Sequence, residues 1–111
     1  MEIVSHIEGE WTVVSLVGRL DAATSGDLER ACGTLLGEGH HRLVLEMTNL
    51  EYISSAGVRV IVAAAKRASH LGGAVAVAGP QGLVAQILKI TAIDTLLPVA
   101  DTVAEAIAAR P

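Results

Sequence analysis

The chain has 111 residues, 51% of them hydrophobic, which is enough for one domain with a substantial buried core. Its formal net charge of −4 is not clustered, and its only aromatic residues are Trp11 and Tyr52, which excludes the basic, ring-lined groove of a nucleic-acid-binding protein. Charged residues interrupt the richest apolar stretches and the start lacks a signal-peptide pattern, so we expect neither a membrane-spanning helix nor direct membrane insertion.

Two β-patterned runs open the chain, at residues 3–8 and 11–18, and they flank the turn residues Gly9 and Glu10. This arrangement predicts an antiparallel hairpin. In the second run, apolar residues occupy both alternating sets of positions, which indicates a central strand with two covered faces.

The clearest amphipathic helix follows the segment 19–24. Thr24 and Asp27 resemble a capping box in which Asp replaces Glu. The apolar residues then recur at helical spacing, at Leu28, Ala31, Cys32, Leu35 and Leu36, and the helix is expected to end at Gly37-Glu38-Gly39. Cys32 lies on this apolar stripe, so we expect a packed thiol. As the single cysteine it excludes an internal disulfide and favours a reducing cytoplasm.

Residues 42–47 predict a strand covered on both faces, apolar apart from Glu46. The stretch 49–58 joins it to a second helix that starts near Ala56 and ends at Gly72-Gly73. The expected buried face of this helix comprises Val58, Ile61, Val62, Ala65 and Ser69. Arg59 and three other residues fall on the opposite arc.

The rest of the chain continues this alternation. Residues 74–78 predict a buried strand, residues 83–90 a third helix, and residues 96–99 a short edge strand broken by Pro98. Thr102 and Glu105 predict a capping box for a last helix. The order predicts an α/β fold, with a mainly parallel sheet of about five strands, an N-terminal antiparallel hairpin and about four helices in one domain, residues 1–111.

Two serines stand where a buried strand leads into a helix. Helix N-termini carry unpaired N–H groups and partial positive charge, so a phosphoryl group on Ser54 or Ser55 would be stabilised there. Two interpretations remain open: both serines serve only as caps, or the turn is a phosphorylatable recognition surface. Asp21 should lie at the same edge of the sheet, either as a local cap or as part of the site.

Catalytic and metal-binding patterns are absent from the sequence. Residues 53–57 lack the first glycine of the G-x-S-x-G elbow, which disfavours a hydrolase. His40 and His41 precede a strand while the serines lie beyond its end, so no histidine has an evident route to them. His40 and His41 are adjacent and have no cysteine or carboxylate cluster beside them, so they do not form a metal-binding pattern. We therefore expect no enzyme activity and no cofactor.

Three segments of the chain together resemble a STAS domain, and more narrowly the bacterial anti-sigma factor antagonists. They are Tyr52-Ile53-Ser54-Ser55-Ala56-Gly57-Val58, Gly18-Arg19-Leu20-Asp21 and Ile90-Thr91-Ala92-Ile93-Asp94-Thr95-Leu96-Leu97-Pro98-Val99. The resemblance runs over essentially the whole chain.

The resemblance implies partner switching in transcription regulation. Such a protein binds an anti-sigma factor that is also a serine kinase, is released when that kinase phosphorylates it, and is restored by a PP2C-type phosphatase. The resemblance also implies that Ser55 is the phosphorylation site, with Ser54 as a second candidate. The implied partner-binding surface comprises Asp21, Thr24, Ser54, Ser55, Ala56, Gly57, Val58 and Arg59.

Two positions depart from the family pattern, since Ser54 stands where Asp is common and Arg59 where glycine is frequent. The alternative within the same fold is the STAS subunit of an ABC-type transport system, or a signalling scaffold, without phosphorylation. Neighbouring genes for a kinase and phosphatase, or for permeases, would distinguish these.

Overall fold

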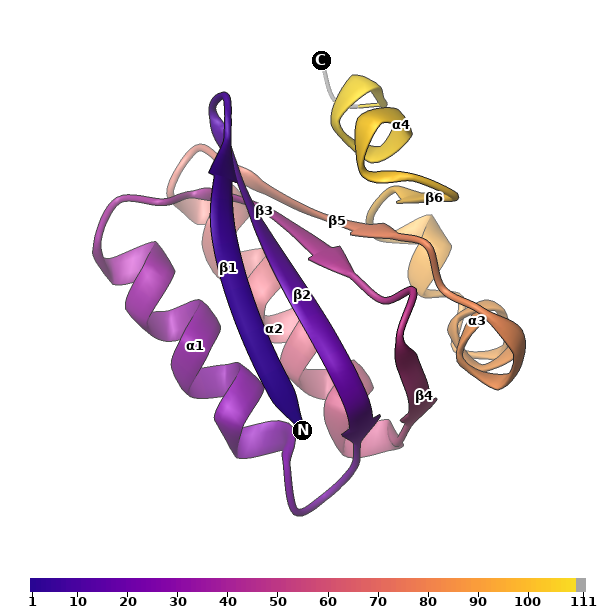
Figure 1. The fold of residues 1–111 in the computed structure, drawn as a ribbon. Helices are drawn as coiled ribbons and strands as arrows, with labels where there is room; N and C mark the ends of the chain where they lie inside the picture. Colours follow the sequence, from indigo (N-terminus) through magenta and orange to yellow (C-terminus); the bar gives the residue numbers. More distant parts are fainter. Residues whose placement is uncertain (110–111) are drawn as a thin grey trace.

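The structure is a computed structural model and describes residues 1–109; Arg110 and Pro111, the end of the expected domain, lie outside the described residues. Residues 1–109 form six strands, four α-helices and one short 3₁₀ helix (Figure 1). In chain order these are β1 (Glu2–Glu8), β2 (Trp11–Leu20), α1 (Ser25–Gly37), β3 (Arg42–Glu46), β4 (Leu50–Ile53), α2 (Ser55–His70), β5 (Ala74–Ala78), α3 (Gly82–Ile90), η1 (Ile93–Thr95), β6 (Val99–Ala100) and α4 (Val103–Ala108).

The sheet confirms the predicted α/β architecture. Its strand order is β1-β2-β3-β5-β6, with β4 pairing to β2 beyond the end of β3. β1 runs antiparallel to β2, and the other described pairs are parallel. β2 is therefore central, as its two apolar faces predict, and β3 and β4 follow one another along the edge of β2 that β1 does not occupy (Figure 1).

The strand β4 was not expected. Its four residues include two buried ones, Leu50 and Ile53, separated by exposed Glu51 and half-buried Tyr52. That pattern has neither the alternation of a half-buried strand nor the continuous apolar run of a covered one. Its pairing with β2 also has a register shift between Gly18 and Arg19. The strand therefore forms through its hydrogen bonds to β2, and its own sequence pattern does not predict it.

The two faces of the sheet are covered unequally. One face carries the larger core, in which side chains of β2, β3 and β5 pack against α1, α2 and α3. On the other face α4 covers a smaller cluster built around Trp11, Val44 and the alanines of β5. Figure 1 shows α4 at the upper right, next to β6.

The buried face of α2 is turned by about one residue from the predicted face. Ile61 is buried as predicted, but Ala64 and Ala68 are buried where Ala65 and Ser69 were expected, and Ser69 is exposed. The reason is that α2 packs against α1 as well as against β5, and small alanines let the two helices approach closely.

The last strand also lies later than predicted. Residues 96–98 are not a strand: Leu96 is exposed after η1, Leu97 is buried, and β6 begins at Val99. Pro98 lacks an N–H, yet its carbonyl oxygen accepts a hydrogen bond from the N–H of Val77 at 2.9 Å and so leads the chain onto the sheet. Its position at an edge is confirmed.

The lone thiol is part of the core. Cys32 is buried on α1, so the packed thiol that the sequence predicts is confirmed, and burial raises its pKa to about 11. Within residues 1–109, no helix combines the length and apolar character needed to cross a bilayer.

Candidate functional site

Two strand-to-helix junctions meet at one edge of the sheet. β2 and β4 end side by side, because Leu20 pairs with Ile53 and the N–H of Ser54 donates to the carbonyl oxygen of Leu20 at 2.8 Å. Asp21 and Ser54 are the next residues after the two strand ends. The sequence-based expectation that they share one edge of the sheet is therefore met in the structure.

We call residues Asp21–Thr24 the β2–α1 junction and residues Ser54–Gly57 the β4–α2 junction. In the β4–α2 junction, Ser54 is the N-cap of α2, with extended backbone dihedral angles (φ −96°, ψ 170°). Its Oγ accepts a hydrogen bond from the N–H of Gly57 at 3.3 Å, and its carbonyl oxygen accepts one from the N–H of Val58 at 3.0 Å. The capping role expected for one of the two serines therefore belongs to Ser54.

Ser55 is the first residue of α2 and differs from its neighbour in two respects. Its side chain is exposed, whereas Ser54 is half-buried. Its hydroxyl also makes no hydrogen bond to any other residue within 1–109. The free hydroxyl therefore stands at the positive end of a 16-residue helix that has no acidic residue in its first turn.

Gly57 holds the junction close to the sheet. A Cβ atom on this residue would lie 2.7 and 2.9 Å from two side-chain carbons of Leu20 and 3.2 Å from Cγ1 of Ile53. Because Leu20 and Ile53 are the last residues of β2 and β4, only glycine lets the first turn of α2 rest on both strand ends. Gly57 is itself buried, so it shapes the surface rather than contributing a side chain to it.

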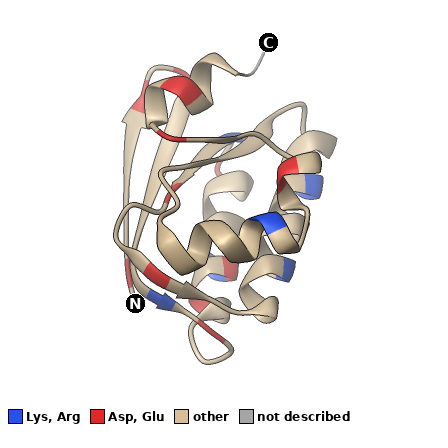
Figure 2. Ribbon diagram, turned by 90° about the vertical axis from the view of Figure 1, so that its right-hand side faces the viewer, with Lys and Arg blue, Asp and Glu red and all other residues tan. Residues whose placement is uncertain are grey.

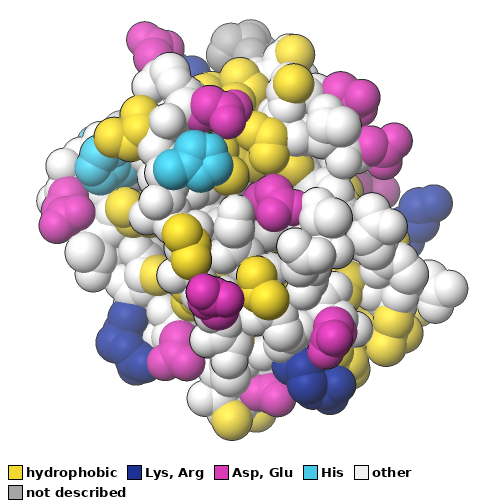
Figure 3. Space-filling view, in the orientation of Figure 1, with side chains coloured by type: hydrophobic (Ala, Val, Ile, Leu, Met, Phe, Trp, Pro, Cys, Tyr) yellow, Lys and Arg dark blue, Asp and Glu magenta, His cyan; other side chains and the backbone are white. Residues whose placement is uncertain are grey.

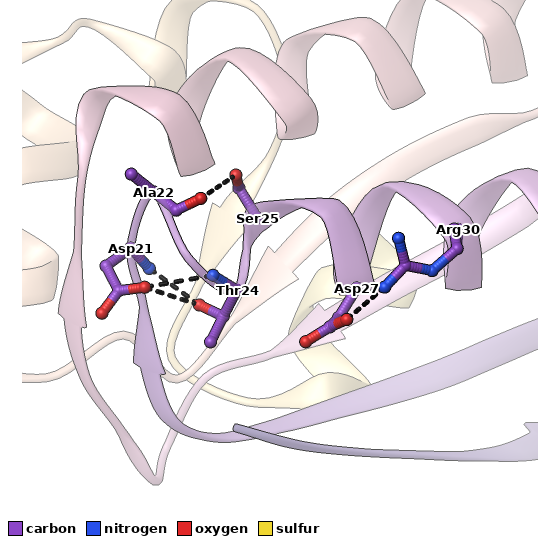
Figure 4. Close-up of polar contacts among 6 residues, drawn as sticks. All are labelled: Asp21, Ala22, Thr24, Ser25, Asp27 and Arg30. Carbon is purple, nitrogen blue, oxygen red and sulfur yellow. Dashed lines mark hydrogen bonds and ion pairs between the residues drawn. The ribbon is translucent and has the colours of Figure 1, made fainter.

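The β2–α1 junction is bound together by its own side chains (Figure 4). Oδ1 of Asp21 accepts hydrogen bonds from the N–H groups of Ala23 (3.0 Å) and Thr24 (3.1 Å). In return Oγ1 of Thr24 accepts from the N–H of Asp21 at 2.9 Å and donates to the carbonyl oxygen of Arg19 at 2.8 Å. Both side chains thus serve the local backbone.

The predicted capping box between Thr24 and Asp27 is wrong. Thr24 occupies the N-cap position but makes no side-chain cap hydrogen bond, because its hydroxyl already binds Asp21 and Arg19. Asp27 instead pairs with Arg30 one turn along α1 (Figure 4).

The same contacts set the charge of Asp21. Partial burial acts to raise its pKa, but hydrogen bonds from Thr24 and Ala23, together with the nearby positive charge of Arg19, outweigh it and hold the pKa of Asp21 below its ordinary value. The site therefore carries a stable negative charge at neutral pH.

Sequence reasoning missed one pair of residues at this edge. The guanidinium of Arg19 lies over the ring of Tyr52, 4.5 Å from its centroid, and the two residues face each other across β2 and β4. The pair was hidden because β4 was not expected, and only the register of that strand brings the two side chains together. Glu51, the neighbour of Tyr52 on β4, is exposed. Figure 2 shows basic and acidic positions close together on neighbouring strands near the N-terminus.

The remaining predicted partner-binding residues surround this edge. Ala56 and Val58 are half-buried, and Arg59 is exposed, one turn after Ser55. The histidines are elsewhere: His40 and His41 precede β3 at the opposite end of the sheet. Among residues 1–109, no three His, Cys, Asp or Glu side chains gather closely enough to hold a metal ion.

This fold and this sheet edge place the chain in a known class. The family model described as "STAS domain" matches residues 2–106, and the chain belongs to that family. The family predicted from the sequence is thus confirmed.

Individual relatives carry more specific names. A Bordetella bronchiseptica protein named "Putative anti-sigma factor antagonist BtrV" is 30% identical over 81% of this chain and 78% of its own. The crystal structure of a Thermotoga maritima protein, also named a putative anti-sigma factor antagonist, superposes with a TM-score of 0.84 at 26% identity, over 95% of this chain and 91% of its own. The phosphorylated form of SpoIIAA, a Bacillus cell fate determinant, shares the fold with a TM-score of 0.74 at 16% identity, over 99% and 100% of the two chains.

Proposed function

We propose that this protein is an anti-sigma factor antagonist, which binds an anti-sigma factor/serine kinase and is released from it when Ser55 is phosphorylated. The observation that carries the proposal is the contrast between the two serines: the hydroxyl of Ser54 caps α2, and that of Ser55 is exposed and has no hydrogen-bond partner among the described residues. The names of the relatives support the partner class, and the phosphorylated form of SpoIIAA supports the chemistry of the switch.

The group transfer would take place in the kinase. Oγ of Ser55 would attack the γ-phosphorus of ATP, the bond from that phosphorus to the ADP oxygen would break, and the hydroxyl proton would pass to a base of the kinase. This chain supplies the hydroxyl and needs no cofactor or catalytic group of its own, so we propose a regulatory protein rather than an enzyme. A PP2C-type phosphatase would reverse the step by hydrolysis.

The switch would act through charge. A phosphoserine adds about −1.5 to −2 charges at neutral pH. The N-terminus of α2 would stabilise that charge without unfolding the helix. A partner surface matched to an uncharged hydroxyl would have to bury it beside the negative Asp21, at a cost of several kcal/mol. A loss of about 4 kcal/mol already raises a dissociation constant nearly a thousandfold.

Ser54 is the second candidate for the modification, and its environment favours it less. Phosphorylation there would replace the hydroxyl that accepts the hydrogen bond from Gly57, at a half-buried position between two strand ends. Such a change would disturb the start of α2, whereas the same group on Ser55 would project into solvent.

The first experiment is intact-mass measurement and peptide mapping of the protein purified from its own cells. We expect one phosphoryl group on Ser55. In wild type a tagged copy should capture an anti-sigma factor, and Ser55→Asp should lose that partner while circular dichroism stays unchanged.

The matched controls are Ser55→Ala, which should keep the partner and lose the phosphate, and Ser54→Ala, which should keep the phosphate. A phosphate found on Ser54 would assign the phosphorylation site to Ser54 instead of Ser55. No phosphate under stressed and unstressed conditions, with Ser55→Asp still bound to its partner, would contradict the switch and favour a transport-system subunit or a scaffold in the cytoplasm.

A further inference from the structure

The strand β1 has an open edge. It comprises seven residues, stands at one end of the strand order and, among the strands of residues 1–109, pairs with β2 alone. Natural proteins usually protect such an edge with charged side chains, above all lysine, with proline, with a bulge or by a very short strand. β1 contains no proline and no lysine, its two carboxylates are its first and last residues, and its pairing with β2 runs without interruption from Glu2 to Glu8. By contrast, the other edge of the sheet is β6, which has two residues.

A groove lies beside this edge. It has a volume of about 400 Å³ between β1 and α1, and its lining is mainly apolar, with Ile3, Val14, Ala31 and Leu35 among the contributors. A strand added along β1 would direct every second side chain into this groove. The side chains of Val4 and Ile7 on β1 are 53% and 66% exposed, so apolar surface is available on both faces of the strand.

The sequence of β1 complements itself. We infer that β1 pairs antiparallel with β1 of a second copy of this chain, about a twofold axis at Val4. In this register Val4 lies opposite Val4 of the second copy, and Glu2 lies opposite its His6, twice by symmetry. Cross-strand pairs of opposite polarity or of two apolar groups stabilise a sheet, and like charges placed opposite destabilise it.

The charge pattern selects this register over its neighbour. A twofold axis at Ser5 would place Glu2 opposite Glu8 of the second copy, two carboxylates at each end of the pair. With the axis at Val4, the imidazole of His6, which already contacts Glu8 of its own chain at 3.3 Å, gains a second carboxylate partner in Glu2 of the other copy. Figure 3 shows hydrophobic, acidic and histidine side chains mixed over the face that these strands present.

This dimer would leave the candidate functional site open. β1 and β4 pair with opposite edges of β2, so the second copy would lie on the far side of β2 from Ser55 (Figure 1). The inference therefore does not rest on the proposed function, and an assembly of two chains would present two separate switch surfaces.

Sedimentation velocity of the full chain, from micromolar to millimolar concentration, tests the inference. We expect the wild-type mass to rise towards that of a dimer. Val4→Glu places two carboxylates on the twofold axis and should weaken the dimer at least tenfold. The matched control is Leu83→Glu on α3, which replaces an apolar residue of similar exposure (50%) away from β1 and should leave the dimer unchanged.

A charge exchange tests the register. His6→Glu sets a new carboxylate opposite Glu2 of the second copy and should weaken the dimer, whereas the double variant Glu2→Lys with His6→Glu should restore it. Circular dichroism checks that each variant is folded. A wild-type chain that stays monomeric at millimolar concentration would overturn the inference, as would equal effects of Val4→Glu and Leu83→Glu, or no recovery in the double variant.

Discussion

The β2–α1 and β4–α2 junctions, which together form the candidate functional site, start from neighbouring strands but are held by different kinds of contact. Each follows a strand of the same pair and starts a helix on the same face. In the β2–α1 junction the Asp21 and Thr24 side chains each bind the backbone more than once. In the β4–α2 junction the single side-chain hydrogen bond is the 3.3 Å contact from the N–H of Gly57 to Ser54, among the described residues.

The difference separates a loop fixed by its own side chains from the loop that the proposed function requires to be modified. Side chains that satisfy their own backbone hold the β2–α1 junction in one conformation. The β4–α2 junction instead depends on backbone packing through Gly57, and the Ser55 hydroxyl makes no hydrogen bond within residues 1–109. A hydroxyl that makes no such bond can be modified without unfolding its surroundings, and that is the property a switch needs.

Gly57→Ala should break this arrangement most strongly. The added Cβ would overlap buried Leu20. Because the added Cβ would lie 2.7 Å from a side-chain carbon of Leu20, we expect the upper part of the range of about 1–3 kcal/mol for overpacking. The roughly 0.5–1 kcal/mol that alanine gains over glycine inside a helix then offsets only part of this cost. We expect a lower free energy of unfolding in urea. Gly26→Ala, in the first turn of α1, is the control and should stabilise slightly, because its Cβ meets only the flexible Arg30 side chain. Equal effects at the two glycines would contradict the packing argument.

Thr24→Val should come next, because it removes the hydroxyl at the centre of the β2–α1 junction and leaves the Asp21 N–H without its partner. We expect a loss of about 1–2 kcal/mol in the free energy of unfolding, the scale of one or two hydrogen bonds. Thr34→Val on the exposed side of α1 is the control and should change stability by less than about 0.5 kcal/mol. If both variants lie within error of wild type, the hydrogen bonds of Thr24 do not support the loop.

Ser54→Ala should have a smaller effect on the same measurement. It removes the cap of α2, and because the bond to Gly57 is long at 3.3 Å, we expect about 0.5–1 kcal/mol, the low end for an N-cap. A loss as large as that of Thr24→Val would show that the two junctions are stabilised to the same degree, which would remove the contrast between them.

Ser55→Ala should have the smallest effect on stability, within about 0.5 kcal/mol of wild type. Its hydroxyl has no hydrogen-bond partner to lose among the described residues. If the proposed function holds, the same variant loses the phosphate in an intact-mass spectrum. The variant should therefore change the phosphorylation state and leave the free energy of unfolding nearly unchanged. A substantial loss of stability would instead indicate a structural role for this hydroxyl.

Much of the arrangement of the candidate functional site could be predicted from the sequence. Ends of parallel strands lie at the same edge of a sheet, and that rule was enough to bring Asp21 next to Ser54. A helix start close to Ser55 and a capping serine also followed from residue type and spacing. The strand β4 did not, because Leu50–Ile53 has no pattern of its own and exists through its register with β2.

Side-chain partners were the part that spacing alone did not determine. Thr24 matched a capping box in sequence, but a threonine hydroxyl has several backbone groups within reach, and the path of the chain from Arg19 to Asp21 gave it closer ones. The buried face of α2 was displaced for a similar reason. Alanines at positions 63, 64, 65 and 68 look alike in sequence, and the neighbouring helix α1 decides which of them are buried.

The strand β2 has a consequence for how the chain tolerates insertions and deletions. One run of ten residues, Trp11–Leu20, aligns with β1, β3 and β4 at once. Deleting one residue inside it would turn the following side chains to the other face and shift Asp21 relative to Ser54 by about 3.3 Å, one residue of strand. The turn at Gly9 and Glu10 projects from the sheet, and the position of Gly9 is open to solvent. Length changes should therefore be accepted at that turn and rejected between Trp11 and Leu20.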